Sequence, residues 1–145
     1  MSTEPSLSNP AKHLRITSPS PWIVRYSSTI PVGGHVLDLA CGGGRHSGYL
    51  LDQGYCVTAI DKDTSAISER LGGRKNLTII TADLETGDNP FADNDALNGQ
   101  KFDAVVAVNY LYRPLMTALI DALKPGGVLL YETFARGNEA YARPR

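Results

Sequence analysis

Four short segments of this sequence gather residue types that suit ligand binding, and each follows an apolar run. The first is residues 38–44, Asp-Leu-Ala-Cys-Gly-Gly-Gly. Glycine adopts positive φ and lets the backbone approach a ligand closely, because it has no Cβ. A carboxylate at Asp38 would repel a pyrophosphate and attract a cationic amine. The segment therefore predicts a binding loop for a ligand that carries positive charge, with a plain connecting turn as the alternative.

The spacing of these glycines also bears on dinucleotide binding, whose fingerprint is G-x-G-x-x-G. Gly42 and Gly44 fill the first two glycine positions, but Ser47 stands at the third and Gly48 comes one residue late. Together with Asp38, this departure counts against a nicotinamide-dependent oxidoreductase, which stays open as an alternative function.

A second acid, Asp61, ends the apolar run 57–60 that follows the glycine loop. An acid about 20 residues after such a loop accepts hydrogen bonds from both hydroxyls of a ribose. Each bond to a charged acceptor contributes about 1.5–3 kcal/mol. Nicotinamide and adenosyl cofactors share this ribose, so Asp61 predicts a nucleoside without separating the two. The alternative is a helix N-cap beside Asp63.

The other two segments follow the third and fourth apolar runs. Asp83 is placed to accept from the exocyclic amine of an adenine, while Leu84 packs on the face of the ring. Residues 109–114, Asn-Tyr-Leu-Tyr-Arg-Pro, end the most apolar run and suit the mouth of a substrate pocket. A surface turn at Asp83 and tyrosines that only cover a strand end are the alternatives.

Three other residues invite chemical roles that their surroundings in the sequence do not support. His46 has no acid or metal ligand at a suitable spacing and is interpreted as a helix-start residue. Cys41 lies near a helix N-terminus, where a thiol pKa falls, but its small size is the simpler reason for its presence. Cys41 and Cys56 form no C-x-x-C pair, so neither a disulfide framework nor a metal site is expected.

Strands and helices alternate along the chain. Helices are expected over 20–30, 45–52, 63–71 and 115–123, and strands over 35–40, 55–60, 76–81, 102–108 and 128–134. Ser20 is the expected N-cap of the first helix, with Pro21 at its first position. Residues 85–100 are expected to form an irregular loop. Alternation of this kind predicts an α/β fold, an open and mostly parallel Rossmann-like sheet with helices on both faces.

Composition limits the classes of partner. The chain of 145 residues, 42% of them hydrophobic, suits one domain over 20–145 after a flexible Ser- and Pro-rich leader over 1–19. A net charge of −1 sets up no long-range field, so neither nucleic acid nor a membrane surface is expected as a partner. No apolar run has the length of a signal core or a membrane span, so the cytoplasm is the expected location.

Five segments resemble, in order and spacing, the class I S-adenosylmethionine-dependent methyltransferases: 36–45, 58–61, 82–84, 102–106 and 123–129. The resemblance covers about residues 20–136. Residues 109–114 and 131–134 are similar to a bacterial subgroup of small methyltransferases related to tellurite-resistance-type proteins. The resemblance implies S-adenosylmethionine as the cofactor and transfer of its methyl group to an unidentified small-molecule acceptor.

The resemblance also implies roles for individual residues. The methionine portion of the cofactor would lie near Asp38 and against Ala40, Cys41, Gly42 and Gly44. The ribose would bind to Asp61, and the adenine would lie beside Lys62, with Asp83 and Leu84 at its edge. The site of methyl transfer would lie beside Asn109 and Tyr110. No catalytic residue is assigned, because a general base is needed only if the acceptor must lose a proton. Tyr110, Tyr112 and Glu132 are candidates for that base, and their spacing favours none of them.

The sequence departs from the family at its C-terminal end. The family sheet normally has seven strands, and only five are found here, so the last would be an open edge. We therefore expect either a truncated chain or a homo-oligomer that pairs through this edge. A non-catalytic cofactor-binding or interaction module is an alternative function on the same ground.

Overall fold

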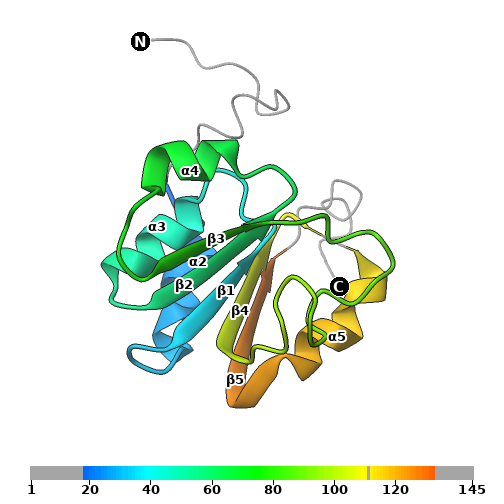
Figure 1. Cartoon of the computed structure of the whole chain (residues 1–145). Helices are drawn as coiled ribbons and strands as arrows, with labels where there is room; N and C mark the ends of the chain where they lie inside the picture. The colour runs from blue at the N-terminus through cyan, green and yellow to red at the C-terminus, as the bar shows by residue number, and fades with distance from the viewer. Residues whose placement is uncertain (1–17, 111, 133–145) are drawn as a thin grey trace, which may run out of the picture.

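A computed structural model describes residues 18–110 and 112–132 and contains a five-stranded sheet. The strands are β1 His35–Leu39, β2 Cys56–Asp61, β3 Leu77–Thr81, β4 Phe102–Val108 and β5 Leu123–Glu132. Their order in the sheet is β3-β2-β1-β4-β5, and every neighbouring pair is parallel (Figure 1). The predicted open α/β sheet is confirmed.

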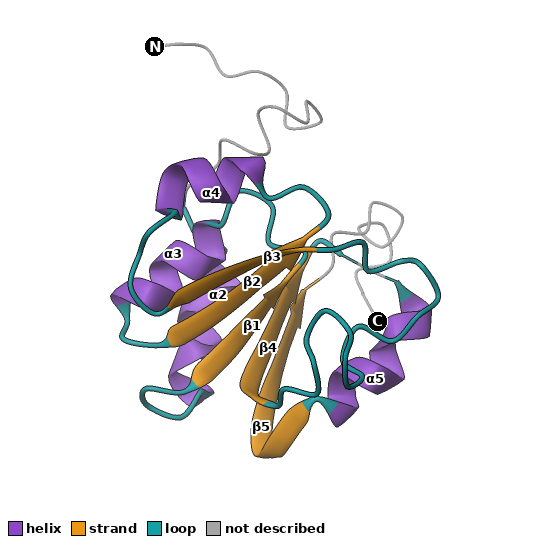
Figure 2. Ribbon diagram, viewed as in Figure 1, coloured by secondary structure: helices purple, strands orange, loops and turns teal. Residues whose placement is uncertain are grey.

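Helices lie on both faces of this sheet, as predicted. They are α2 Pro21–Tyr26, the 3-10 helix η1 Ser27–Thr29, α3 Arg45–Asp52, α4 Ser65–Leu71, the 3-10 helix η2 Arg113–Leu115 and α5 Met116–Asp121. Figure 2 shows α2, α3 and α4 on one side of the sheet and α5 on the other. Residues 85–100 form no helix or strand, as expected, and bring Phe91 and Leu97 into the core on the α5 side.

The apolar run of β4 is explained by burial on both faces. Val105 and Ala107 pack toward α5, and Ala104 and Val106 pack toward α2 and α3, all four without exposed surface. A strand covered on both faces needs apolar residues at every position instead of at alternate ones. This burial holds the end of β4 firmly against the end of β1, where the candidate site lies.

The first helix is shorter than the sequence predicts. Ser20 is its N-cap, as expected, and the side chain accepts a hydrogen bond of 3.2 Å from the Trp22 N–H. The α-helix ends at Tyr26 and continues as η1 up to Thr29.

The predicted boundary between the last helix and the last strand is wrong. The helix was expected to reach 123 and the strand to begin at 128, but α5 ends at Asp121 and β5 begins at Leu123. Phe102 pairs with Leu123, and the pairing resumes only at Ala104 and Val128, so residues 124–127 bulge from the ladder. The Pro-Gly-Gly sequence predicts the end of a helix, but it forms a bulge within the strand.

β5 forms one edge of the described sheet. Among the residues that the structure describes, it pairs only with β4. Residues 1–17 of the leader expected over 1–19, and the last two residues of the predicted final strand, 133 and 134, lie outside the described residues. None of the helices described is both long enough and apolar enough to cross a bilayer.

Candidate cofactor site

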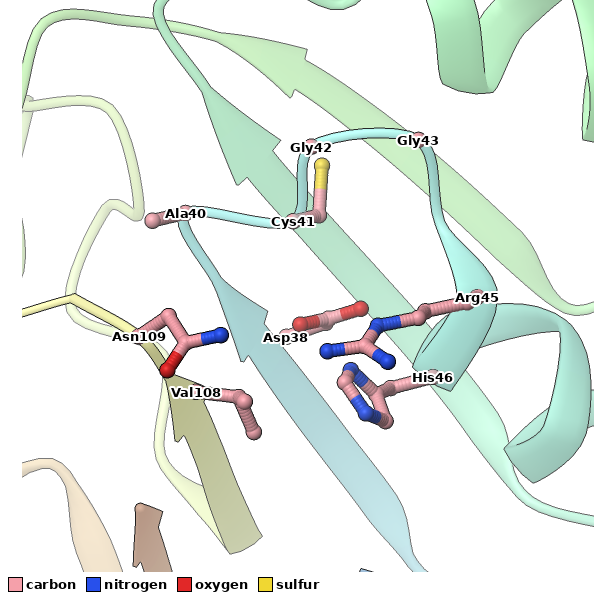
Figure 3. Close-up of a pocket in the computed structure, with 9 residues that line it drawn as sticks. All are labelled: Asp38, Ala40, Cys41, Gly42, Gly43, Arg45, His46, Val108 and Asn109. Atoms are coloured by element: carbon pink, nitrogen blue, oxygen red, sulfur yellow. The ribbon is translucent and has the colours of Figure 1, made fainter. Parts of the chain in front are cut away.

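The carboxyl ends of β1, β2 and β4 meet at one edge of the sheet, where two adjoining cavities open. Their volumes are about 40 Å³ and about 360 Å³. Ala40, Gly42, Val108 and Asn109 line both. Asp38, Cys41, Gly43, Arg45 and His46 complete the smaller cavity (Figure 3), and Asp61, Lys62, Asp83, Leu84, Glu85 and Tyr110 complete the larger one. Because ligand pockets measure roughly 300–1,000 Å³, the larger cavity has room for a nucleoside.

Every predicted site residue lines one of these cavities except Gly44. Gly44 is the N-cap of α3 and has a φ of +84°. A Cβ at this position would lie 2.6 Å from Cγ1 of Ile67 in α4. The structure therefore places Gly44 against α4, and it is needed there for the close packing of the loop on that helix.

Asp38 lies beneath the smaller cavity and is only 3% exposed. The Ser47 hydroxyl donates to its Oδ2 over 2.7 Å. Burial raises the pKa of Asp38 to about 6, with a smaller opposing contribution from the hydrogen bonds with Ser47. A cationic group in the cavity would favour the ionised carboxylate, because an opposite charge lowers the pKa of an acid.

The glycine loop is held in place by side chains from β2 and α4. The Gly42 N–H donates to Asp61 Oδ2 over 2.8 Å, and the Arg70 guanidinium donates to the Gly43 carbonyl. The other oxygen of Asp61, Oδ1, accepts from the Lys62 N–H over 2.7 Å. Oδ1 also accepts a longer bond of 3.4 Å from the Asp63 N–H. A carboxylate offers about four acceptor positions, two on each oxygen, so Asp61 keeps its remaining capacity for a ligand at Oδ2.

Asp61 is not the N-cap of the following helix. Thr64 occupies the cap position of α4, and Asp63 Oδ1 accepts from the Ser65 N–H over 3.0 Å. The alternative role of Asp61 as a helix N-cap is therefore wrong. Its carboxylate instead holds the glycine loop and lines the larger cavity.

Cys41 is buried in surroundings that favour its protonated thiol. Burial, then the charges of Asp38 and Asp61, raises the pKa of this thiol far above its usual range. A protonated thiol is a small apolar group, in agreement with the interpretation made from size.

Arg45 and His46 are cavity residues that sequence reasoning missed. Figure 3 shows the Arg45 guanidinium beside the Asp38 carboxylate and the His46 ring. Arg45 Nη1 donates to the Ser18 carbonyl over 3.2 Å. The signal was the Gly-Arg-His sequence at the start of the helix, where both side chains project back toward the loop.

His46 starts α3, as interpreted, but it also has a distant partner. Its Nε2 accepts a hydrogen bond of 3.0 Å from the Ser20 N–H. Burial and the neighbouring Arg45 charge lower the pKa of His46 to about 4. The ring is therefore neutral at physiological pH, with its proton on Nδ1 because Nε2 is the acceptor.

The structure places the three candidates for a general base in different surroundings. Tyr110 lines the larger cavity, whereas Tyr112 and Glu132 line neither cavity. Glu132 Oε1 accepts from the Ser20 hydroxyl over 2.6 Å. Burial, followed by the nearby Glu85 carboxylate, raises the pKa of Tyr110. Its hydroxyl is buried and makes no hydrogen bond of normal geometry among the described residues, and the Glu85 carboxylate is the acceptor close to it.

An open parallel sheet with a glycine loop and two acidic strand ends around a single cleft is the arrangement of a class I methyltransferase domain. Residues 36–127 match the family described as methyltransferase domain. The chain belongs to this family.

Individual relatives agree with this assignment. The chain is 32% identical over 113 residues to the ubiquinone biosynthesis O-methyltransferase of Histophilus somni (strain 2336), covering 74% of this chain and 48% of that protein. The glycopeptide N-methyltransferase MtfA, solved with S-adenosyl-L-methionine, is 30% identical with a TM-score of 0.60, covering 77% of this chain and 52% of MtfA. A TehB-like methyltransferase from Corynebacterium glutamicum shares the fold, with a TM-score of 0.61 at 22% identity, over 83% of this chain and 68% of its own. The chain spans about half the length of the curated relatives it matches.

Proposed function

We propose that this chain is the S-adenosylmethionine-binding part of a methyltransferase that acts on a small-molecule acceptor. The observation that carries the proposal is one cleft bounded by Asp38, the glycine loop and Asp61. Support comes from MtfA, a solved relative that holds S-adenosyl-L-methionine, and from relatives named as O-methyltransferases.

The larger cavity suits the adenosine portion of that cofactor. Asp61 would accept from the ribose hydroxyls, and Lys62 would lie beside the adenine. Asp83 would accept from the adenine amine, and Leu84 would pack on the ring. The Tyr110 hydroxyl, buried and without a hydrogen bond of normal geometry among the described residues, would donate to the ligand.

The smaller cavity suits the methionine portion. Asp38 and Arg45 present opposite charges to the same small space. An amino-acid moiety carries an ammonium and a carboxylate on one carbon, so one anionic and one cationic side chain beside the same cavity suit it. Asp38 would face the ammonium, and Arg45, a planar donor suited to carboxylates, would face the carboxylate.

Methyl transfer depends mainly on the positions of the methyl donor and its acceptor. The cofactor, when bound, supplies an electrophilic methyl group on a sulfonium. The chain must hold the acceptor in line at roughly 3–3.5 Å from that group. Asn109 and Tyr110 stand at the end of β4 beside the cleft and are the residues we place next to the acceptor. Tyr110 stays protonated because of its raised pKa, so its role is to donate a hydrogen bond.

Location and partners are part of the same proposal. The two cysteines are free thiols, which suits the reducing cytoplasm. The net charge of −1 favours a small molecule over nucleic acid or a membrane surface as the partner.

Calorimetry with S-adenosylmethionine and its demethylated product tests the proposal. We expect micromolar binding of both. Asp61→Ala removes the charged ribose acceptor and the partner of the Gly42 N–H, so we expect binding to weaken by at least tenfold, or about 1.4 kcal/mol. Asp88→Ala, in the exposed loop, is the matched control and should bind like the wild type. Folded wild-type protein that binds neither compound would refute the proposal.

A non-catalytic binding module is a second candidate, because no side chain that lines the described cleft is assigned as a general base. Both candidates predict cofactor binding, so binding does not distinguish them. Transfer of the methyl group distinguishes them, and it is measured by incubating the protein with methyl-labelled cofactor and a small-molecule extract. Transfer of the label above the level of the Asp61→Ala control would exclude the binding module.

A further inference from the structure

Ser20 joins three parts of the chain that are far apart in the sequence. Its backbone N–H donates to His46 Nε2 over 3.0 Å, across 26 residues. Its hydroxyl donates to Glu132 Oε1 over 2.6 Å, across 112 residues. Ser20 is only 5% exposed, so water does not compete freely for these bonds. The start of α2, the start of α3 and the end of β5 are thus connected at one residue.

These contacts reach the smaller cavity through Arg45 and His46, which both line it. His46 bonds to Ser20, and Arg45 donates to the carbonyl of Ser18, two residues earlier. Residues 18–20 therefore hold both cavity side chains from the N-terminal side. An Arg side chain loses considerable freedom when it is fixed, and here part of that freedom is already lost before any ligand binds.

We propose that Ser20 is a positioning residue that fixes Arg45 and His46 at the methionine end of the cofactor cleft. Ser20 does not line either cavity, so it acts through these two side chains. The inference rests on the proposed function, because it assumes that the amino-acid end of the cofactor occupies the smaller cavity. It also gives Glu132 a role as the anchor of Ser20, in place of a general base.

The substitution Ser20→Asp separates this role from helix capping. Aspartate is as good an N-cap as serine, so it keeps the acceptor for the Trp22 N–H. It has no hydroxyl proton to donate, and it places a second carboxylate opposite Glu132. Like charges at this distance repel, so residues 18–20 would move away from β5 and release Arg45 and His46. Ser20→Thr keeps the hydroxyl and is the conservative variant. Ser28→Asp, at an exposed position of η1, is the control for the added charge.

The affinities of two ligands show which end of the cleft the substitution affects. S-adenosylhomocysteine carries the amino-acid portion, and 5′-methylthioadenosine lacks it. We expect Ser20→Asp to raise the Kd of S-adenosylhomocysteine about tenfold and to leave that of 5′-methylthioadenosine within about twofold, a selectivity near 1 kcal/mol. Ser20→Thr should restore most of the affinity, and Ser28→Asp should bind both ligands like the wild type.

Each other result counts against the inference. Unchanged affinity for S-adenosylhomocysteine, or an equal loss for both ligands, would overturn it while leaving the proposed function standing. A wild-type protein that binds neither ligand would overturn both. If Ser20→Asp does not fold, Glu132→Leu and Glu132→Gln replace it, because Glu132 lines neither cavity and accepts from the Ser20 hydroxyl. Leu removes that acceptor and should lose S-adenosylhomocysteine selectively, whereas Gln keeps an acceptor oxygen and should retain most of the affinity. Equal behaviour of the two variants would overturn the inference.

Discussion

Asp38 is a buried acid whose ionised form the fold stabilises only weakly. The carboxyl group is buried at the end of β1, where its ionised form is stabilised by hydrogen bonds from the hydroxyl and the backbone N–H of Ser47 and by the charge of Arg45. Burial outweighs both and raises its pKa to about 6. A buried acid with a raised pKa at a cleft is typical of a functional site. The charge of a bound ammonium would supply the missing stabilisation.

The pKa of Asp38 leads to a prediction about stability. The carboxyl group ionises near pH 3.8 in the unfolded chain and near 6 in the folded chain. Between these values the folded state binds more protons, so the contribution of Asp38 to stability is present below pH 3.8 and is lost as the pH rises through 6. The loss is about 3 kcal/mol, at about 1.4 kcal/mol for each pH unit. Asn at this position can still accept from Ser47 and does not ionise.

Denaturant unfolding of the wild type and Asp38→Asn at a series of pH values checks this prediction. We expect Asp38→Asn to gain stability relative to the wild type between pH 4 and 6 and to keep that gain at pH 7. Asp88→Asn, in the exposed loop, controls for the loss of a charge. Parallel pH profiles of the wild type and Asp38→Asn would show that this group does not titrate with a raised pKa.

Most of the cleft residues were predictable because each lies at the end of a strand or directly after it. A strand end positions its next residues at the same edge of the sheet as its neighbours do, so Asp38, Asp61 and Asp83 could be brought together from the sequence. The contacts of Arg45 and His46 could not be predicted from the sequence. Their partners lie in the N-terminal segment, and nothing in local spacing shows a contact across 26 residues.

At the scale of elements, the packing of the glycine loop against α4 depends on Gly44. Its φ of +84° disfavours any residue with a Cβ, and the Ile67 side chain fills the space where that Cβ would lie. Gly54 also has a positive φ, of +95°, but nothing lies within 4 Å of its Cβ position. A substitution at Gly54 would therefore introduce backbone strain alone, whereas a substitution at Gly44 would introduce backbone strain and a steric clash.

Gly44→Ala should destabilise the fold more than Gly54→Ala. A left-handed conformation costs a residue with a Cβ about 1–2 kcal/mol, and overpacking adds about 1–3 kcal/mol. We expect a loss of about 1–2 kcal/mol for Gly54→Ala and about 2–5 kcal/mol for Gly44→Ala in denaturant unfolding. Equal losses would mean that Ile67 moves aside freely and that the loop does not depend on close packing with α4.

The strands were easier to predict than the junction between α5 and β5. Apolar runs such as 102–108 have the length and composition of buried strands, and β4 has these bounds. Proline followed by two glycines normally ends a helix and starts a turn. Only the pairing of Phe102 with Leu123 shows that the same residues form a bulge inside a strand. Register with a neighbouring strand is a tertiary property, and local sequence does not contain it.

At the scale of the whole molecule, the sheet has unequal edges. β3 is short and half-exposed, with Thr78 and Thr81 open to solvent. β5 is the longer edge, and its residues 128–131 are apolar or aromatic. Among the described residues its outer side has no partner. A long apolar edge presents unpaired N–H and C=O groups to any strand that can add to it.

We therefore expect this chain, by itself, to associate through β5. Sedimentation velocity should show the weight-average mass rising with protein concentration. Amide hydrogen exchange should become slower in β5 and stay unchanged in β3, because only amides that gain a partner are protected by association. A fold that shields β5 in the monomer predicts the opposite pattern: one sedimenting species at every concentration, and β5 amides as protected in dilute solution as those of β4. The exchange data thus distinguish an edge closed by a second copy from an edge already closed within one chain.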